Sequence, residues 1–308
     1  MITRRDVEEA ARRLEGRVRR TPLLADGPCD IGLKLENLQR TGSFKLRGAT
    51  NAVLWALEAE PDSLRAGVST MSAGNHGRAL ATAARDAGIP CTVYVPPNPV
   101  QAKVDAMRTL GAQVVERPHE VLAEALRTDD AGDGRLFIGP FAHPMVAAGQ
   151  GTVGLEISEQ APGAEVVYVP IGGGGLSSGL VTALADHPCR IIGVTAEKSP
   201  ALRRALRDGT FEWVTPTSIA DGLGSPIARQ ENVALLAKGL DEVVVVTDDE
   251  IRAAMRRLAL EAKVVAEPAG AAASAAAWRD GPEGAVAVVS GGNVDSSLLA
   301  SVVEGTST

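Results

Sequence analysis

The sequence predicts an α/β fold in which helices cover parallel β-sheets, and three features of the chain support this. Short runs of β-branched residues alternate with alanine-rich helical stretches along the 308 residues, an order typical of strand–helix–strand units. Several runs, such as EVVYVP (165–170) and AVAVVS (285–290), are almost continuously apolar, as central strands of a parallel sheet are. Glycine-rich segments follow three of the runs, at the end where open α/β sheets bind their ligands.

The expected elements follow one another along the chain. We expect strands at Ile31–Leu35, Val68–Met71, Cys91–Val95, Gln113–Glu116, Glu165–Pro170, Arg190–Ala196, Glu242–Val246 and Ala285–Val289. Helical stretches between them include His76–Ala87, Val100–Leu110, Leu176–Ala185 and Asp249–Glu261. The segment MITRRDVEEAARRLEG is an expected amphipathic helix with Val7, Ala10, Ala11 and Leu14 on one face. The run AGAAASAAAW (269–278) is interpreted as a tightly packed helix with a face of small side chains.

The composition is that of a globular protein with a sizeable core. Hydrophobic residues make up 45% of the chain, and the mean hydropathy is +0.05. The length suits one large or two modest domains. The net charge of -7 and the pI of about 5.3 argue against nucleic acid as a partner, because proteins that bind it usually present a basic face. An arginine-rich run from Arg12 to Arg20 is interpreted as a solvated helix face.

Neither a membrane nor an oxidising compartment is indicated. No segment approaches about 18 uninterrupted apolar residues, and the first residues contain no apolar signal-peptide core. The three cysteines, Cys29, Cys91 and Cys189, are odd in number, widely spaced and without a CxxC pair. We therefore expect reduced thiols and a cytoplasmic protein. We also expect a homo-oligomer, namely a dimer.

The segment IGGGGLSSG (171–179) follows an apolar strand and precedes a helix. Its four glycines remove every side chain there, so backbone N–H groups and the positive end of the helix dipole can bind an anion, above all a phosphate. A tight turn without a ligand is the alternative. The segment lacks the lysine of a P-loop and the last glycine of a dinucleotide-binding GxGxxG motif. It also contains a GxSxG match around Ser177. We interpret this as coincidence, because the one downstream histidine, His187, lies at the far end of the same expected helix.

Lys45 lies in TGSFKLRGA (41–49), beside Phe44 and just before an expected helix. A lysine held at such a junction can be partly desolvated, which lowers its pKa and makes the neutral amine nucleophilic, as Schiff-base chemistry requires. A solvated lysine is the alternative, and Arg47 is the candidate for the surface residue of this pair.

Two further loops follow expected strands. In SAGNHG (72–77), polar groups meet the N–H groups of a helix start, which suits a carboxylate, and Asn75 can donate to an oxygen of a cofactor ring. N-capping by Ser72 or Asn75 and a structural role for His76 are the alternatives. In SGGNVD, Ser290 can donate to a neutral ring nitrogen, and a glycine-rich turn with a serine cap is the alternative. Because these loops are far apart in sequence, a shared ligand is the economical explanation for all of them.

Taken together, these motifs resemble the serine/threonine dehydratase family of fold-type II pyridoxal-phosphate enzymes, whose members include threonine deaminases and serine racemase. The motifs KLENLQRTGSFKLRGA, SAGNHG, AGQGTVGLEI, VPIGGGGLSSG, IADGLGSP, VVAEPAGAA and SGGNVD occur in the family's order and span nearly the whole chain. The resemblance implies a two-domain α/β architecture with parallel or mixed sheets, similar to that of tryptophan synthase β. Residues 1–47 and 145–308 would form the large domain and residues 48–144 a small nested domain. Pyridoxal 5′-phosphate would bind in the cleft between them.

The resemblance also implies roles for individual residues. Lys45 is similar to the Schiff-base lysine, which is also the base at Cα. The cofactor-binding residues that the resemblance implies are Phe44, Lys45, Asn75 at the phenolic oxygen, Gly172, Gly173, Gly174, Gly175 and Leu176 at the phosphate, and Ser290 at the pyridine nitrogen. The implied substrate-binding residues are Ser72, Ala73, Gly74, Asn75, His76 and Ser225.

Several departures from the family pattern carry information. Racemizing relatives have a second serine where Ala73 stands, so we expect elimination without racemization. Some relatives bind a divalent cation through a glutamate and an aspartate six residues later. Here Glu197 is followed by Arg203, so we expect no such metal site. The loop at 139–142 is GPFA instead of the usual HPFD or HPFN, which indicates an altered substrate preference. With only Ser296 to Thr308 after the last motif, we also expect no regulatory domain.

The function implied by the resemblance is pyridoxal-phosphate-dependent β-elimination. A small β-hydroxy amino acid, L-threonine or L-serine, would be dehydrated and deaminated to a 2-oxo acid and ammonia, as in an ammonia-lyase. The alternatives are a dehydratase for another 3-hydroxy amino acid such as 3-hydroxyaspartate, a β-replacement enzyme, a serine racemase and a non-catalytic binding protein. SGGNVD and IADGLGSP argue against β-replacement, and the presence of Lys45 argues against a protein without catalysis.

Overall fold

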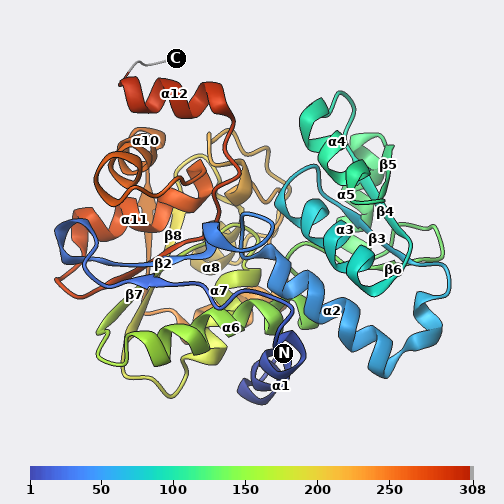
Figure 1. Cartoon of the computed structure of the whole chain (residues 1–308), viewed down its shortest axis with the longest axis horizontal. Coiled ribbons are helices and arrows are strands. Elements are labelled where there is room, and N and C mark those ends of the chain that lie inside the picture. The colour runs from blue at the N-terminus through green and yellow to red at the C-terminus, as the bar shows by residue number, and fades with distance from the viewer. Residues whose placement is uncertain (306–308) are drawn as a thin grey trace.

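The computed structural model describes residues 1–305 and contains two separate β-sheets (Figure 1). The larger sheet has the strand order β1 (Leu23–Leu24), β2 (Gly32–Leu35), β10 (Val286–Val289), β7 (Val166–Pro170), β8 (Arg190–Ala196) and β9 (Glu242–Val246). The smaller sheet has the order β5 (Gln113–Glu116), β4 (Cys91–Val95), β3 (Val68–Met71) and β6 (Leu136–Phe137). All neighbours are parallel except β1, which is antiparallel to β2. The predicted α/β fold with parallel and mixed sheets is confirmed.

Every expected strand is present to within one residue at its first position, and two further strands were not predicted. These are β1 and β6, which have two residues each. So short a strand shows no alternation or apolar run, and its pairing partner alone defines it.

Helices cover both sheets. They are α1 (Arg4–Leu14), α2 (Lys45–Ala59), α3 (Asn75–Ala87), α4 (Gln101–Thr109), α5 (His119–Thr128), α6 (Pro144–Gln160), α7 (Gly175–Ala183), α8 (Ala201–Asp208), α9 (Gln230–Gly239), α10 (Asp248–Arg257), α11 (Pro268–Asp280) and α12 (Ser296–Glu304). Single turns lie at η1 (Pro28–Asp30), η2 (Glu36–Leu38), η3 (Pro61–Leu64) and η4 (Asp221–Leu223), and a π-helical turn, η5 (Leu258–Ala262), extends α10. The expected helix at Asp249–Glu261 is therefore α10 together with η5. In α1 the expected apolar face is buried except at Ala11, which is partly exposed.

Three main cores hold these layers together. On one face of the larger sheet, Tyr168 and Val194 pack against α10 and α11, and on the other face Val167 and Val169 pack against α6, α7 and α9. Alternate residues of β7 thus face opposite layers, which explains why a central strand is apolar at consecutive positions. Helix α11 lies close to the sheet, as predicted, because its buried side chains are small. They include Ala269, Ala271, Ala272 and Ala273. The third core joins α2 and α3 to the smaller sheet.

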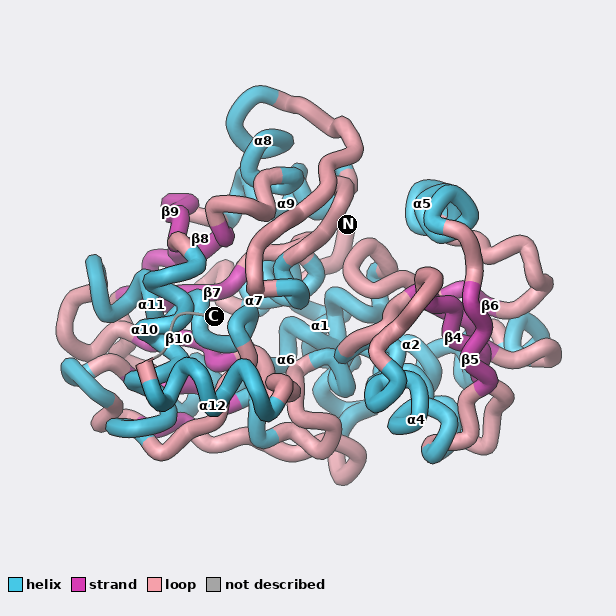
Figure 2. The backbone as a smooth tube through the Cα atoms, turned by 90° about the horizontal axis from the view of Figure 1, so that it is seen from above, coloured by secondary structure: helices cyan, strands magenta, loops and turns pink. Residues whose placement is uncertain are grey.

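The sheets lie in separate halves of the molecule, with α2 and α6 between them (Figure 2). All strands of the smaller sheet fall between residues 68 and 137, and all strands of the larger sheet lie outside that range. The loops that follow β3, β7 and β10 therefore come from both halves. Within residues 1–305 no helix is long and apolar enough to cross a membrane. The three cysteines are free thiols, and Cys91 and Cys189 are buried.

Candidate active site

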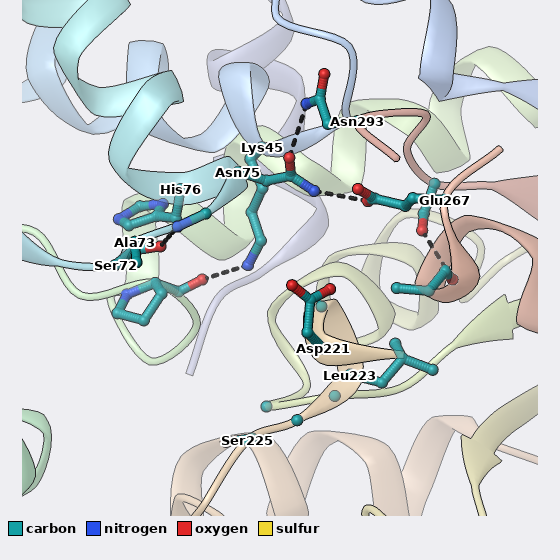
Figure 3. Close-up of a pocket in the computed structure, with 18 of the residues that line it drawn as sticks. Lys45, Ser72, Ala73, Asn75, His76, Asp221, Leu223, Ser225, Glu267 and Asn293 are labelled. Atoms are coloured by element: carbon teal, nitrogen blue, oxygen red, sulfur yellow. Dashed lines mark hydrogen bonds between the residues drawn. The ribbon is translucent and has the colours of Figure 1, made fainter. Parts of the chain in front are cut away.

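One cavity of about 810 Å³ lies where the loops after β3, β7 and β10 meet the start of α2 (Figure 3). Every site residue predicted from the sequence lines it, namely Phe44, Lys45, Ser72, Ala73, Gly74, Asn75, His76, Gly172, Gly173, Gly174, Gly175, Leu176, Ser225 and Ser290. The structure thus brings loops that are distant in sequence together around one space. What each side chain does there depends on its contacts.

Lys45 is the first residue of α2, and it is half-buried in the wall of the cavity. Its Nζ donates a hydrogen bond to the carbonyl oxygen of Pro140 at 2.8 Å and lies 5.1 Å from the centre of the Phe44 ring. Burial lowers the pKa of Lys45 to about 8, although the carboxyl group of Glu267 opposes this by favouring the charged amine. Part of the amine is therefore neutral and nucleophilic near neutral pH.

The four glycines between β7 and α7 pack closely against other loops. A Cβ on Gly173 would lie 2.3 Å from the Phe141 ring, and one on Gly175 would lie 3.0 Å from Phe141 Cα. Gly174 has a φ of +94°, which favours glycine, and its Cβ would contact Asn232. The missing side chains therefore point toward protein, so tight packing explains why these positions are glycine. The loop nevertheless lines the cavity at the first turn of α7, where N–H groups have no partner within the helix and can bind an anion.

Asn75 is held by two side chains that the sequence argument did not single out. Its Nδ2 donates to Oε1 of Glu267 at 2.6 Å, and its Oδ1 accepts from Nδ2 of Asn293 at 2.7 Å (Figure 3). Burial raises the pKa of Glu267 to about 7, and repulsion from Asp221 adds to the rise. Glu267 and Asn293 belong to the motifs VVAEPAGAA and SGGNVD. A glutamate before a proline at a helix start is, however, indistinguishable from an ordinary N-cap in one sequence.

The imidazole of His76 is directed at the protein backbone. The residue is 2% exposed, and its Nε2 contacts the carbonyl oxygen of Ile138 at 2.9 Å. Because a carbonyl only accepts hydrogen bonds, Nε2 carries the proton. Burial lowers the pKa of His76 to about 3, and the nearby charge of Lys45 adds to this, so the ring is neutral. These contacts support the structural alternative for the His76 ring, while the loop that carries it lines the cavity.

Each predicted serine contacts the backbone through its hydroxyl group. Oγ of Ser72 accepts from the N–H of Gly74 at 3.2 Å. Oγ of Ser225 donates to the carbonyl two residues further on at 2.8 Å. Oγ of Ser290 donates to the carbonyl of Ala269 over a longer distance, 3.3 Å. Because a hydroxyl group can rotate, Ser290 is able to exchange this long bond for one to a ring nitrogen.

Arg47 lies in the first turn of α2 and is fully buried, so its interpretation as a surface residue is wrong. It is 1% exposed and forms paired hydrogen bonds with the carboxylates of Glu36 and Glu156. Lys34, which is 0% exposed, also contacts Glu156, at 2.5 Å. Two cations and two carboxylates neutralise one another there, which makes their burial tolerable. This cluster fixes the helix that begins with Lys45.

Ser177 and Glu197 lie outside the cavity lining. Ser177, the serine of the GxSxG match, is 0% exposed and donates to the carbonyl of Gly174, while Nδ1 of His187 accepts from the N–H of Cys189. The pair is therefore not arranged as a nucleophile and its base. Glu197 is exposed and Arg203 is partly exposed on α8. In the described part of the chain, no three His, Cys, Asp or Glu side chains are grouped as a metal site would require.

The fold and the cavity together define one class of protein, the fold-type II enzymes that use pyridoxal phosphate. Comparison with known proteins agrees: the chain belongs to the family described as pyridoxal-phosphate dependent enzyme, whose model matches residues 14–291. It is 41% identical to L-threonine ammonia-lyase of Thermotoga maritima over 320 aligned positions, which cover 98% of this chain and 78% of that relative.

Solved structures show the same likeness. The crystal structure of threonine deaminase from T.th. is 35% identical to this chain, with a TM-score of 0.86. The match covers 96% of this chain and 99% of the threonine deaminase chain. Serine racemase from Dictyostelium discoideum is 32% identical, with a TM-score of 0.84 and the same coverage. The predicted family, fold type and cofactor are confirmed.

Proposed function

We propose that the protein dehydrates and deaminates a small β-hydroxy amino acid, L-threonine or L-serine, to a 2-oxo acid and ammonia. The observation that carries this proposal is the Lys45 amine, which lies in the same cavity as the glycine loop and the SAGNHG loop. Relatives named L-threonine ammonia-lyase and threonine deaminase support the choice of substrate.

The residues of the cavity fit pyridoxal phosphate. Lys45 would hold its aldehyde carbon, and residues 172–176 would bind its phosphate at the start of α7. Ser290 would donate to its ring nitrogen, and Asn75, fixed by Glu267 and Asn293, would face its phenolic oxygen. Bound in this way, the cofactor supplies an electron sink for the negative charge that develops at Cα of the amino acid.

The chain's own groups would carry out the remaining steps. The N–H groups of the SAGNHG loop would bind the substrate carboxylate, with Ser225 on the opposite wall. Lys45, freed when the substrate amine takes its place, would remove the proton at Cα. The β-hydroxyl would then leave as water, and the proton removed from Cα balances the proton that the hydroxyl gains. The product would be released as an enamine, take up a proton at Cβ to become an imine, and be hydrolysed by water to the 2-oxo acid and ammonia.

The charges of the cavity favour a neutral side chain on the substrate. The cavity has two cationic side chains apart from Lys45 in the described lining, Arg78 and Lys103. Nη1 of Arg78 donates to Asn293 at 3.1 Å, and Nζ of Lys103 lies 3.2 Å from the carboxylate of Asp221. Asp221, Glu267 and Asp295 also line the cavity, and the negative charge of these carboxyl groups disfavours a second carboxylate on the substrate. This argues against 3-hydroxyaspartate.

A panel of amino acids tests the proposal. Purified holoenzyme would be given L-threonine, L-serine, 3-hydroxyaspartate and phenylserine, and the 2-oxo acid would be measured. Added sulfide would report β-replacement, and chiral chromatography would report racemization. We expect L-threonine or L-serine to give the highest kcat/KM. Preferred turnover of 3-hydroxyaspartate, or no turnover of any amino acid despite a bound cofactor, would refute the proposal.

The organisation of the chain belongs to the same proposal. We propose a large domain of residues 1–47 and 145–308 and a small domain of residues 48–144; the last three residues of the large domain lie outside the described ones. The distribution of the strands over two sheets supports this division. We also propose a homodimer in the cytoplasm, which light scattering and cell fractionation would test.

A further inference from the structure

We propose that Asn232 is a positioning residue. It would anchor the phosphate loop, residues 172–176, to the loop in which the carbonyl of Pro140 accepts a hydrogen bond from Lys45. The inference rests on the proposed site and adds to it a residue that the family motifs above do not include.

The side chain of Asn232 has all its hydrogen-bonding groups in use. It lies in the first turn of α9 and is 3% exposed. Its Nδ2 donates to the carbonyl of Gly173 at 2.6 Å and to the carbonyl of Phe141 at 3.0 Å. Its Oδ1 faces the hydroxyl of Ser178 on α7 at 3.4 Å. One buried amide thus joins three segments that are far apart in sequence.

The hydrogen bond from Asn232 to Gly173 fixes the orientation of one peptide group in the phosphate loop. A carbonyl oxygen carries partial negative charge, and in a loop made of glycines it can turn easily toward an anion and repel it. Asn232 engages this oxygen and so holds the peptide in one orientation. Asn232 also contacts the neighbouring glycine, because a Cβ on Gly174 would lie 3.1 Å from Asn232 Cβ.

The hydrogen bond from Asn232 to Phe141 fixes the residue next to the one that contacts the amine of Lys45. Phe141 follows Pro140 directly, and the carbonyl of Pro140 accepts the hydrogen bond from Lys45. The Phe141 ring also packs against Gly173. The loop that faces the amine and the loop proposed to face the phosphate are therefore in contact and share one anchor. If the anchor is lost, both loops gain freedom, and water gains access to the amine.

The experiment compares Asn232→Ala with Asn51→Ala. Asn51 is a matched control, because it is also a buried asparagine whose Nδ2 donates to a backbone carbonyl, that of Met145, and it does not line the cavity. For each apoenzyme the affinities for pyridoxal phosphate and for pyridoxal would be measured. The pH dependence of covalent attachment to pyridoxal would be followed by borohydride reduction and mass spectrometry.

We expect Asn232→Ala to weaken binding of pyridoxal phosphate by at least about tenfold, as the loss of two buried hydrogen bonds implies. Binding of pyridoxal should change less, because pyridoxal has no phosphate for the loop to hold. The midpoint of attachment should move to higher pH, because a better hydrated amine is protonated more readily. Asn51→Ala should lose stability but keep the wild-type preference for the phosphate and the wild-type midpoint.

If both variants lose similar stability and Asn232→Ala retains both properties, Asn232 is only structural and the inference is wrong. If Asn232→Ala does not fold, Asn232→Leu takes its place, since leucine fills a similar volume but cannot donate hydrogen bonds. The proposed function fails separately, when the wild-type apoenzyme itself does not bind pyridoxal phosphate.

Discussion

The amine of Lys45 donates a hydrogen bond to the carbonyl oxygen of Pro140 at 2.8 Å. Pro140 belongs to the GPFA segment, which differs from the pattern expected of the family at Gly139 and Ala142, so a substitution in that loop bears directly on the proposed catalytic lysine. Burial around the pair gives Lys45 a pKa of about 8. The place of this amine in the cavity and its burial lead to two predictions about Lys45.

Lys45→Ala removes the proposed covalent anchor and base. We expect no borohydride-stable link to the cofactor and a kcat lowered by roughly a hundredfold to ten-thousandfold, as loss of a general base implies. Absorbance spectra, mass spectrometry and steady-state kinetics would measure this. Lys238→Ala, on the exposed end of α9, is the control. Near-normal turnover by Lys45→Ala would refute the site as a whole.

The pKa of Lys45 predicts how fast the apoenzyme attaches pyridoxal phosphate at each pH. Only the neutral amine attacks an aldehyde, and the neutral fraction grows as pH rises through the pKa. Attachment should therefore accelerate with a midpoint near pH 8. A midpoint near 10.5, the ordinary value for lysine, would show that the amine is solvated instead.

The loops of this site could be predicted because each follows a strand. Ligands of open α/β sheets bind at the carboxyl ends of strands, so SAGNHG, IGGGGLSSG and SGGNVD were expected to share one ligand. They do line one cavity, although β3 belongs to the smaller sheet and β7 and β10 belong to the larger one. Arg47 was misjudged because charged side chains are usually exposed. Its partners, Glu36 and Glu156, are identified by the fold alone. Asn232 lies within a helix and belongs to no glycine-rich loop, so one sequence carried no signal for it.

Gly173→Ala tests the close packing of the phosphate loop. The added methyl group would lie 2.3 Å from the Phe141 ring, so the ring or the loop must move. We expect a loss of about 1–3 kcal/mol in the free energy of unfolding, as for other overpacked sites, and weaker binding of pyridoxal phosphate. Gly163→Ala is the control, because a Cβ there meets nothing within 4 Å. Equal behaviour of the two variants would show that the loop is not constrained by Phe141.

Glu267→Gln removes a buried carboxyl group but keeps an oxygen that can accept from Asn75. The pKa of Glu267 is about 7 in the folded chain and 4.5 ordinarily. The wild type should therefore lose stability relative to the variant as pH rises from 4.5 to 7, because Glu267 ionises first in the unfolded chain. Above pH 7 the variant should be more stable by up to about 3 kcal/mol, and below pH 4.5 the advantage should vanish.

Chemical denaturation across this pH range would measure the effect, with the exposed Glu283→Gln as control. The same variant should also lower the midpoint of attachment at Lys45, because Glu267 favours the charged amine. An unchanged pH dependence of stability would contradict the raised pKa.

Ala73 bears on the choice between elimination and racemization. It lines the cavity between Ser72 and Gly74, and its methyl group has no proton to exchange on the second face of the substrate. We therefore expect the wild type to form a 2-oxo acid from L-serine without detectable D-serine. Ala73→Ser adds a hydroxyl group in a loop with space around it, since a Cβ on Gly74 would meet nothing within 4 Å. Some racemization should appear, at a cost in the rate of elimination, although a serine needs suitable neighbours to exchange a proton at this site.

The decisive measurement for this prediction uses the wild type. L-Serine would be incubated with the holoenzyme in deuterated water, and both the deuterium content and the configuration of the recovered serine would be determined. Deuterium at Cα with retained L configuration would show exchange from the Lys45 face alone, as expected. D-Serine formed at a rate comparable to that of pyruvate would show that another group protonates the second face. In that case Ala73 does not determine the outcome, and the serine racemase neighbours would become the better guide to the activity of this chain.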